Sequence, residues 1–112
     1  MFARSVSMRL KPKTVADFNQ TLENEVLPIL RQRNGFQEEL VLVTPDGTEA
    51  IAISLWDNKE NAEEYHRSTF PEVQKLLSKV IDGTPRVQNY DVPIASFHKV
   101  AVRRGGGSRS GD

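Results

Sequence analysis

The chain has 112 residues, of which 38 % are hydrophobic and 27 % charged, which is the composition of one ordinary globular domain. Fifteen basic residues balance fifteen acidic ones, so no excess charge points to a nucleic acid or an anionic membrane as partner. The absence of cysteine excludes a disulfide framework, a thiolate metal site and a cysteine nucleophile, and it fits a reducing compartment. No apolar block of roughly 20 residues and no signal-peptide pattern is present, so we expect a cytoplasmic protein with no membrane partner.

The first predicted elements are a strand and a long helix. Residues 5–10 alternate polar with apolar side chains, which is the period of a half-buried strand. Thr14 is the expected N-cap of a helix that carries an apolar stripe and ends at Asn34-Gly35. Pro28 lies inside this helix and removes a backbone hydrogen bond, so we expect a kink near Glu25-Val26.

The middle of the chain predicts a hairpin. Residues 36–44 and 48–56 are rich in β-branched and aliphatic side chains, and the sequence Thr44-Pro45-Asp46-Gly47 between them is a turn signal. The two segments are therefore expected to pair as neighbouring antiparallel strands.

A second helix is predicted after the hairpin. Asp57 and Glu60 have the spacing of a capping-box variant and are expected to begin it. Pro71 interrupts the helical pattern, and an apolar stripe resumes over residues 73–81. Two helical pieces should therefore meet at Thr69. The inward face of the first piece is predicted to consist of Ala62, Tyr65, His66 and Thr69.

The last predicted elements are extended. Asp82-Gly83 is expected to separate the second helix from a strand over residues 86–92, which continues as an extension over residues 94–102. Four of the seven glycines lie in the last ten residues, so residues 103–112 are expected to form a flexible Gly/Ser/Arg tail. The folded domain is predicted over residues 1–102.

The order β-α-β-β-α-β predicts a ferredoxin-like α+β fold, in which both helices cover one face of an antiparallel sheet. One face of the sheet is expected to be apolar and to consist of Val6, Met8, Leu10, Ile51, Ile53 and Leu55. The other is expected to be small or polar and to consist of Ser5, Ser7, Arg9, Ala50, Ala52, Ser54 and Trp56. A single-layer sheet with such a second face is often completed by a second copy, so we expect a homodimer with sheets facing each other.

One segment carries a family resemblance. Trp56 ends a strand, the run Asn58-Lys59-Glu60-Asn61-Ala62-Glu63-Glu64-Tyr65-His66 follows, and Ser68 and Phe70 come next. This pattern, with Gly35-Phe36 at the start of the second strand, resembles the antibiotic biosynthesis monooxygenase (ABM) family. The resemblance implies that two ferredoxin-like subunits form a dimeric α+β barrel.

The resemblance also bears on activity. The family includes cofactor-independent oxygenases of phenolic polyketides, quinol oxygenases, haem-degrading enzymes and proteins without a known reaction. The haem-degrading branch is disfavoured, because the positions that match its Asn, Trp and His hold Val6, Tyr65 and Gln74 or Lys75. The resemblance implies an architecture and a pocket rather than a substrate, and the main hypothesis is an oxidoreductase, a cofactor-independent monooxygenase acting on a small hydrophobic, aromatic or quinol-like molecule.

The predicted catalytic residues are His66 and Tyr65. The ordinary pKa of a histidine suits proton abstraction at neutral pH, and a phenol or anthrone must lose a proton before its anion can reduce oxygen. Tyr65 and serine hydroxyls could then hold the anion by hydrogen bonds. The residues predicted to bind substrate are Trp56, Ser5, Ser7 and Ser54. For each, a purely structural role is the alternative, and burial of His66 is expected in either case.

Other functions are weighed against this one. The histidines, His66 and His98, have no acidic pattern beside them, so no metal is expected, and no glycine-rich phosphate loop or cofactor motif is present. RNA-binding modules share the strand order, but residues 48–55 offer no aromatic side chain. The open alternative is a non-catalytic domain of the same fold that binds a small molecule or serves assembly, and an amino-acid-sensing regulatory domain is a third class. The role of His98, expected at the surface or at a dimer contact, is left open.

Overall fold

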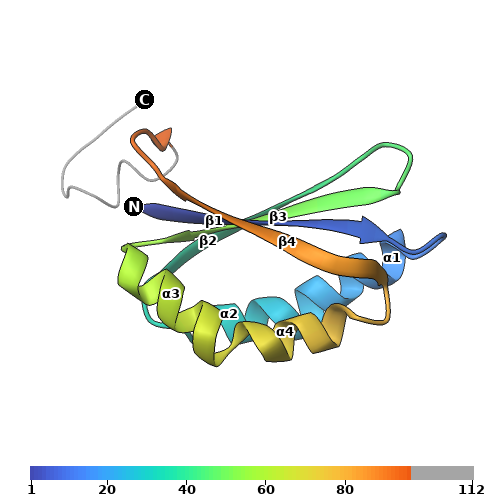
Figure 1. Ribbon diagram of the computed structural model, residues 1–112, viewed down its shortest axis with the longest axis horizontal. Helices are drawn as coiled ribbons and strands as arrows, with labels where there is room; N and C mark the ends of the chain where they lie inside the picture. The colour runs from blue at the N-terminus through green and yellow to red at the C-terminus, as the bar shows by residue number, and fades with distance from the viewer. Residues whose placement is uncertain (97–112) are drawn as a thin grey trace.

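The computed structural model describes residues 1–96. Its helices and strands, shown in Figure 1, are β1 (Phe2–Leu10), α1 (Val15–Thr21), the π-helical turn η1 (Leu22–Val26), α2 (Leu27–Arg31), β2 (Phe36–Val43), β3 (Glu49–Trp56), α3 (Lys59–Ser68), α4 (Phe70–Leu77) and β4 (Ile81–Asp91).

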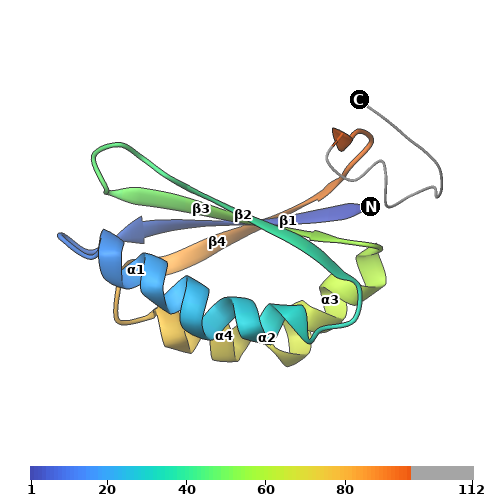
Figure 2. The same cartoon turned by 180° about the vertical axis from the view of Figure 1, so that it is seen from behind.

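The four strands form one antiparallel sheet in the order β2-β3-β1-β4. The two views in Figures 1 and 2 show every helix on the same side of this sheet, with the other side left open. The predicted ferredoxin-like α+β fold is therefore confirmed. Among residues 1–96, no helix combines the length and the apolar character that crossing a membrane requires.

The first helix is continuous but irregular. Its middle turn, η1, is π-helical, and it directly precedes α2, the α-helical segment that contains Pro28. Proline has no amide hydrogen to donate to the preceding turn, and a widened turn is one way in which a helix accommodates that loss. The disturbance predicted near Glu25-Val26 is confirmed in position, and its form is a π turn.

Two predicted helix caps are wrong in detail. The Thr14 hydroxyl does not cap its helix, because it donates instead to the carbonyl oxygens of Lys11 and Val80, at 2.6 and 3.3 Å. The cap of α3 is Asn58 rather than Asp57: the Asn58 side chain accepts from the Asn61 amide at 2.9 Å. Only the residue just before the first helical residue can reach the free amides of the first turn in this way.

Gly35 fixes the start of α3 against the start of β2. Its φ of +82° is unfavourable for other residues, and a Cβ at this position would collide with the side chains of Asp57 and Asn61, which are hydrogen-bonded to each other. The Asp57 amide donates to the Gly35 carbonyl at 2.9 Å. Asn34-Gly35, where the first helical region was predicted to end, thus forms a turn that also packs closely against the start of α3.

The predicted separation at Asp82-Gly83 is wrong. Strand β4 already begins at Ile81, and its pairing with β1 shifts between Ser7 and Arg9. Gly83, with φ of +72°, lies in this bulge rather than between two elements. The predicted extension over residues 94–102 and the tail over residues 103–112 lie largely or wholly outside the described residues.

The predicted faces of the sheet are wrong for β3. Directly paired residues point to the same face, and Val6 pairs with Ala52 while Ser7 pairs with Ile51. The helix-facing residues of β3 are therefore Ala50, Ala52, Ser54 and Trp56. Short alanine side chains in the middle of the sheet leave space for the buried side chains of the helices.

The open face of the sheet consequently carries apolar side chains of β3 beside the polar side chains of Ser5, Ser7 and Arg9 predicted for it. Leu40, Leu42, Ile51 and Tyr90 lie on it with between 37 % and 54 % of their surface exposed. Exposed apolar side chains gathered on one face are unusual for a monomer.

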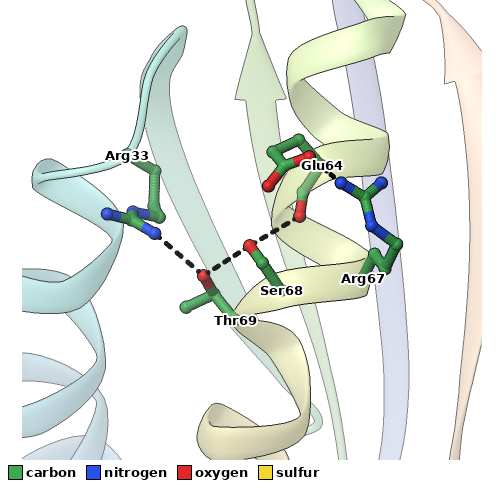
Figure 3. Close-up of polar contacts among 5 residues, drawn as sticks. All are labelled: Arg33, Glu64, Arg67, Ser68 and Thr69. Carbon is green, nitrogen blue, oxygen red and sulfur yellow. Dashed lines mark hydrogen bonds and ion pairs between the residues drawn. The ribbon is translucent and has the colours of Figure 1, made fainter.

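A polar cluster fixes the junction between α3 and α4 (Figure 3). Arg33, which follows α2, donates to the Thr69 hydroxyl at 3.1 Å, and the Ser68 hydroxyl lies 3.1 Å from that same oxygen. Ser68 also donates to the Glu64 carbonyl at 2.8 Å, and Glu64 forms an exposed ion pair with Arg67. The junction predicted at Thr69 is confirmed, and Arg33 ties it to the first helical region.

Candidate functional site

The interior between the sheet and the helices contains a cavity of about 30 Å³. Its apolar lining consists of Val6, Met8, Leu22, Val26, Leu30, Ala52, Phe70, Val73 and Leu77. Its polar lining consists of Arg4, Glu39, Ser54 and Tyr65. A space of this size holds one or two water molecules or a diatomic molecule, and it is much smaller than the roughly 300 to 1,000 Å³ of ordinary ligand pockets.

Three of the polar residues form a row across the sheet. Glu39 on β2 pairs with Ser54 on β3, and Ser54 pairs with Arg4 on β1. Because paired residues share a face, all three side chains point toward the helices, into an otherwise apolar layer. Asn89 on β4 continues the row beyond Arg4.

Trp56 forms the aromatic wall next to this row. Its side chain is 0 % exposed, and its ring centroid lies 5.7 Å from that of Phe36 and 5.0 Å from that of Tyr65. The indole Nε1 donates to the Ser54 hydroxyl at 2.9 Å. Trp56 and Ser54, two of the residues predicted to bind substrate, are thus hydrogen-bonded to each other, but the indole has no exposed surface for a ligand to stack on.

Arg4 is the central charge of the site. The residue is only 3 % exposed, and its guanidinium carbon lies 4.2 Å from the ring centroid of Phe70 and 5.2 Å from that of Tyr65. Within residues 1–96 it makes no ion pair within 4 Å, and its one side-chain hydrogen bond goes to His66. Burial lowers the pKa of Arg4, although the nearby Tyr65 and Glu39 oppose this effect. The cation is therefore held by aromatic faces and one neutral partner.

His66 accepts from Arg4, which fixes the state of its ring. The Arg4 Nη2 lies 2.6 Å from His66 Nδ1, and because a guanidinium only donates, Nδ1 must be the acceptor. The proton of the neutral ring is then on Nε2. Desolvation and the Arg4 charge both lower the pKa of His66, which keeps the ring neutral. The expected burial of His66 is wrong: the residue is exposed and stacks on Phe70, with the ring centroids 5.6 Å apart.

The charge of Glu39 is changed by its surroundings. Burial raises the pKa of the Glu39 carboxyl to about 8, and the opposing effect of Arg4 is smaller. The buried Oε1 atom of Glu39 has no hydrogen-bond partner among the described residues. At neutral pH this carboxyl is mostly protonated, so the charge of Arg4 is not balanced by Glu39. Burial likewise raises the pKa of the Tyr65 hydroxyl, which remains a neutral donor.

The structure brings only part of the predicted site together. Tyr65, His66, Trp56 and Ser54 lie on the helix side of the sheet, in contact with one another through Arg4 or directly. Ser5 and Ser7 pair with Ile53 and Ile51 and lie on the open face. His98 lies outside the described residues.

Sequence reasoning missed Arg4 and Glu39, although a signal was present. Each stands two residues before an apolar residue of its strand that faces the helices: Val6 follows Arg4, and Val41 follows Glu39. A charge in the buried register of a strand is rare unless it is paired or functional. Among residues 1–96, no cluster of three or more histidine, aspartate or glutamate side chains could hold a metal ion.

Comparison with known proteins identifies structures that share this fold. No protein-family model matches the chain, and no curated protein matches its sequence. A putative antibiotic biosynthesis monooxygenase from Bordetella bronchiseptica is similar in structure, with a TM-score of 0.70 and 16 % identity, over 83 % of this chain and 97 % of that one. The monooxygenase from the gene ActVA-Orf6 of Streptomyces coelicolor, solved with the ligand Nanaomycin D, has a TM-score of 0.71 and 18 % identity, over 84 % and 88 %.

A third similar structure is a putative antibiotic biosynthesis monooxygenase from Deinococcus radiodurans, with a TM-score of 0.68 and 15 % identity, over 85 % of this chain and 95 % of that one. At these identities the likeness shows the fold alone. The resemblance read from Trp56 to Phe70 is confirmed at that level: the chain has the fold of the ABM proteins.

Proposed function

We propose that this chain binds a small aromatic or quinol-like molecule between α3 and the sheet and oxidises it with molecular oxygen, without a cofactor. The observation that supports this most is the row of Arg4, Ser54 and Glu39 with Tyr65 around a cavity in an otherwise apolar interior. Polar groups whose pKa values are shifted by burial are concentrated at functional sites. The similar Streptomyces monooxygenase was solved with the ligand Nanaomycin D, which supports small-molecule binding by a chain of this fold.

The proposed chemistry requires that the substrate supply its own electrons. A base removes a proton from the phenol or anthrone, and Arg4 and the Tyr65 hydroxyl stabilise the resulting anion. The anion then reduces oxygen and forms a carbon–oxygen bond, and loss of water completes the reaction. A substrate CH₂ group and one O₂ thus yield one C=O group and one H₂O, with no external reductant.

Two side chains are candidates for the base. His66 is the predicted one, but the Nδ1 lone pair that would accept a proton is already accepting a hydrogen bond from Arg4. Glu39 has a pKa of about 8, near the value at which a base works best at neutral pH, and it lines the cavity. We propose Glu39 as the base, with His66 as a positioning residue that orients Arg4.

Oxygen consumption tests the proposed oxidation. With an anthrone and a panel of hydroquinones in air, we expect uptake of one O₂ per product, a loss of about 10²- to 10⁴-fold in Glu39→Gln, and little loss in Glu38→Gln on the other face. The rate should rise with pH through a value near 8 if Glu39 is the base. A rise below pH 6.5, lost in His66→Ala, would identify His66 instead.

The second candidate is binding without chemistry. It is favoured by the buried charge of Arg4, which can hold a ligand without any reaction, in a cavity of about 30 Å³ that a ring system enters only if the wall moves. Saturable ligand binding that depends on Arg4, with no oxygen uptake above buffer for any member of the panel, would support this function over oxidation.

We also propose that the open face of the sheet is covered by a second copy of the chain. Leu40, Leu42, Ile51 and Tyr90 support this, because burying their exposed surface is favourable. A hollow of about 570 Å³ on this face, lined by side chains that include Leu42, Ile51 and Arg86, offers room for side chains of a partner. The sheets would then face each other, as the fold of dimeric α+β barrels implies.

Sedimentation velocity tests the dimer. At micromolar concentration we expect the wild-type chain to sediment as a dimer and the double variant Leu40→Glu/Leu42→Glu as a folded monomer, because two charges would be buried unpaired in the interface. The matched control Gln20→Glu places a charge on α1, on the opposite side of the molecule, and should remain dimeric. A wild-type monomer would contradict the proposal.

A further inference from the structure

The site contains a buried positive charge that no group of the described chain neutralises. Arg4 is 3 % exposed, and its one side-chain hydrogen bond within residues 1–96 goes to a neutral histidine. Taking a cation out of water without an anion beside it is unfavourable, and aromatic faces compensate only partly. An anion at the cavity would supply the missing partner.

The carboxyl of Glu39 does not supply the missing anion. Glu39 lies two strands away in the same row, with Ser54 between them, and its Oε1 atom is buried without a hydrogen-bond partner. Because burial raises the pKa of this carboxyl to about 8, it carries a proton at neutral pH and can donate a hydrogen bond. An arginine and a neutral carboxylic acid that line the same cavity form two donors for one anionic oxygen or carboxylate.

The surroundings add no second charge. The titratable side chains that line the cavity are Arg4 from β1, Glu39 from β2 and Tyr65 from α3. His66 does not line the cavity but is hydrogen-bonded to Arg4. The contribution of β3 is Ala52 and Ser54. The helices η1, α2 and α4 contribute only apolar side chains, which are Leu22, Val26, Leu30, Phe70, Val73 and Leu77. The net charge of the lining at neutral pH is therefore +1.

We propose that the ligand of this site is a small planar monoanion, with its anionic oxygen or carboxylate held between the guanidinium of Arg4 and the carboxyl of Glu39. The inference rests on the proposed binding function and names its ligand class: an acidic phenol, an enolate or an aromatic carboxylate, rather than a neutral or cationic ring. When a neutral phenol gives its proton to ionised Glu39, the result is the phenol anion beside protonated Glu39. The two states differ only by the position of one proton, so the same site accommodates both the reactant and the product of the proposed deprotonation.

Isosteric probes separate charge from shape. Benzoate, benzamide and benzamidinium share size and planarity, and acetate, acetamide and acetamidinium repeat the comparison at a size close to that of the cavity. By calorimetry at pH 7, we expect the anion of at least one series to bind about 10-fold or more tightly than its neutral amide, and the cation not to bind. No preference for the anion in either series, including no binding at all, overturns the inference.

Variants of Arg4 and Glu39 test whether the preference for anionic ligands arises at this cavity. Arg4→Met should abolish it, whereas Arg9→Met, on the same strand but on the open face, should keep it. Arg4→Lys retains the charge and should retain a smaller preference, so a folding defect in Arg4→Met does not decide the outcome. In Glu39→Gln, anion binding should persist at pH 7 and should lose the decline that the wild-type chain shows above pH 8.

The outcomes distinguish this inference from the proposed oxidation. A chain that selects anions through Arg4 but consumes no oxygen keeps the inference and contradicts the oxidation. Turnover of neutral substrates without any anion preference contradicts the inference and keeps the oxidation. An anion preference that is unchanged in Arg4→Met, or in Arg4→Lys where Arg4→Met does not fold, places the anion elsewhere and overturns the inference.

Discussion

Replacement of Trp56 by alanine is expected to lower the free energy of unfolding by about 3 to 5 kcal/mol, the range observed when a large buried ring is removed. Trp56 is 0 % exposed, and it is one of the two largest fully buried side chains among the described residues. Its ring lies between Phe36 and Tyr65, and its Nε1 donates to Ser54. Alanine would leave a cavity and remove the donor that satisfies a buried hydroxyl.

Urea denaturation at one protein concentration measures this loss. Ile94→Ala is the matched control, because Ile94 is 84 % exposed and its truncation should change the free energy by less than about 0.5 kcal/mol. Trp56→Phe keeps an apolar ring but not the donor, and a loss of about 1 to 2 kcal/mol is expected. A loss below about 1 kcal/mol in Trp56→Ala would contradict the core role of the indole.

The same variants test whether Trp56 also serves the ligand. If the ring acts only through packing, Trp56→Phe should leave benzoate affinity unchanged once the variant is shown to be folded. A ligand that stacks on the indole would lose affinity in Trp56→Phe by more than its stability loss explains, because a smaller ring offers less contact area. The structural and ligand-binding interpretations of Trp56 are thus separable by one substitution.

The order of elements could be predicted from the sequence because it depends on local patterns. Alternation in residues 5–10, the turn at Asp46-Gly47 and the break at Thr69 each reflect chemistry within a few residues. The face of β3 could not be predicted in this way. Ala50 to Trp56 alternate small with aliphatic side chains, and either set can face helices. The observed pairing of Val6 with Ala52 depends on how closely the helices approach the sheet, which is a tertiary property.

Only the residues of the candidate site that lie in the segment carrying the family resemblance could be predicted from the sequence. The segment from Trp56 to His66 indicated Tyr65 and His66, and Arg4 contacts both. Arg4 and Glu39 come from strands that the resemblance describes less well, and their importance depends on a row that forms only when β2, β3 and β1 pair. Ser5 and Ser7 lie on the face of β1 that was predicted for them, but Ser54 and Trp56 were wrongly placed on the same face, so the two serines cannot share a pocket with them.

The free energy of unfolding is expected to fall as the pH rises from about 4.5 to about 8, through the titration of Glu39. Burial raises the pKa of this carboxyl from 4.5 to about 8 in the folded chain. Between these values the folded chain holds a proton that the unfolded chain has released, so stability is fully present below pH 4.5 and is lost with rising pH. A shift of this size corresponds to at most about 5 kcal/mol, and we expect on the order of 2 to 3 kcal/mol because water and local movement relax the buried charge.

Glu39→Gln isolates this contribution, because glutamine has nearly the same shape and cannot ionise. The difference in unfolding free energy between the wild-type chain and Glu39→Gln, measured in urea at pH 5, 6.5 and 8.5, should shift in favour of the variant as pH rises. Glu38→Gln changes the neighbouring, exposed carboxyl and should follow the wild-type profile. Parallel profiles for the wild-type chain and Glu39→Gln would mean that Glu39 is ionised throughout this range. Arg4 would then already have its anion, and the reason for an anionic ligand would disappear.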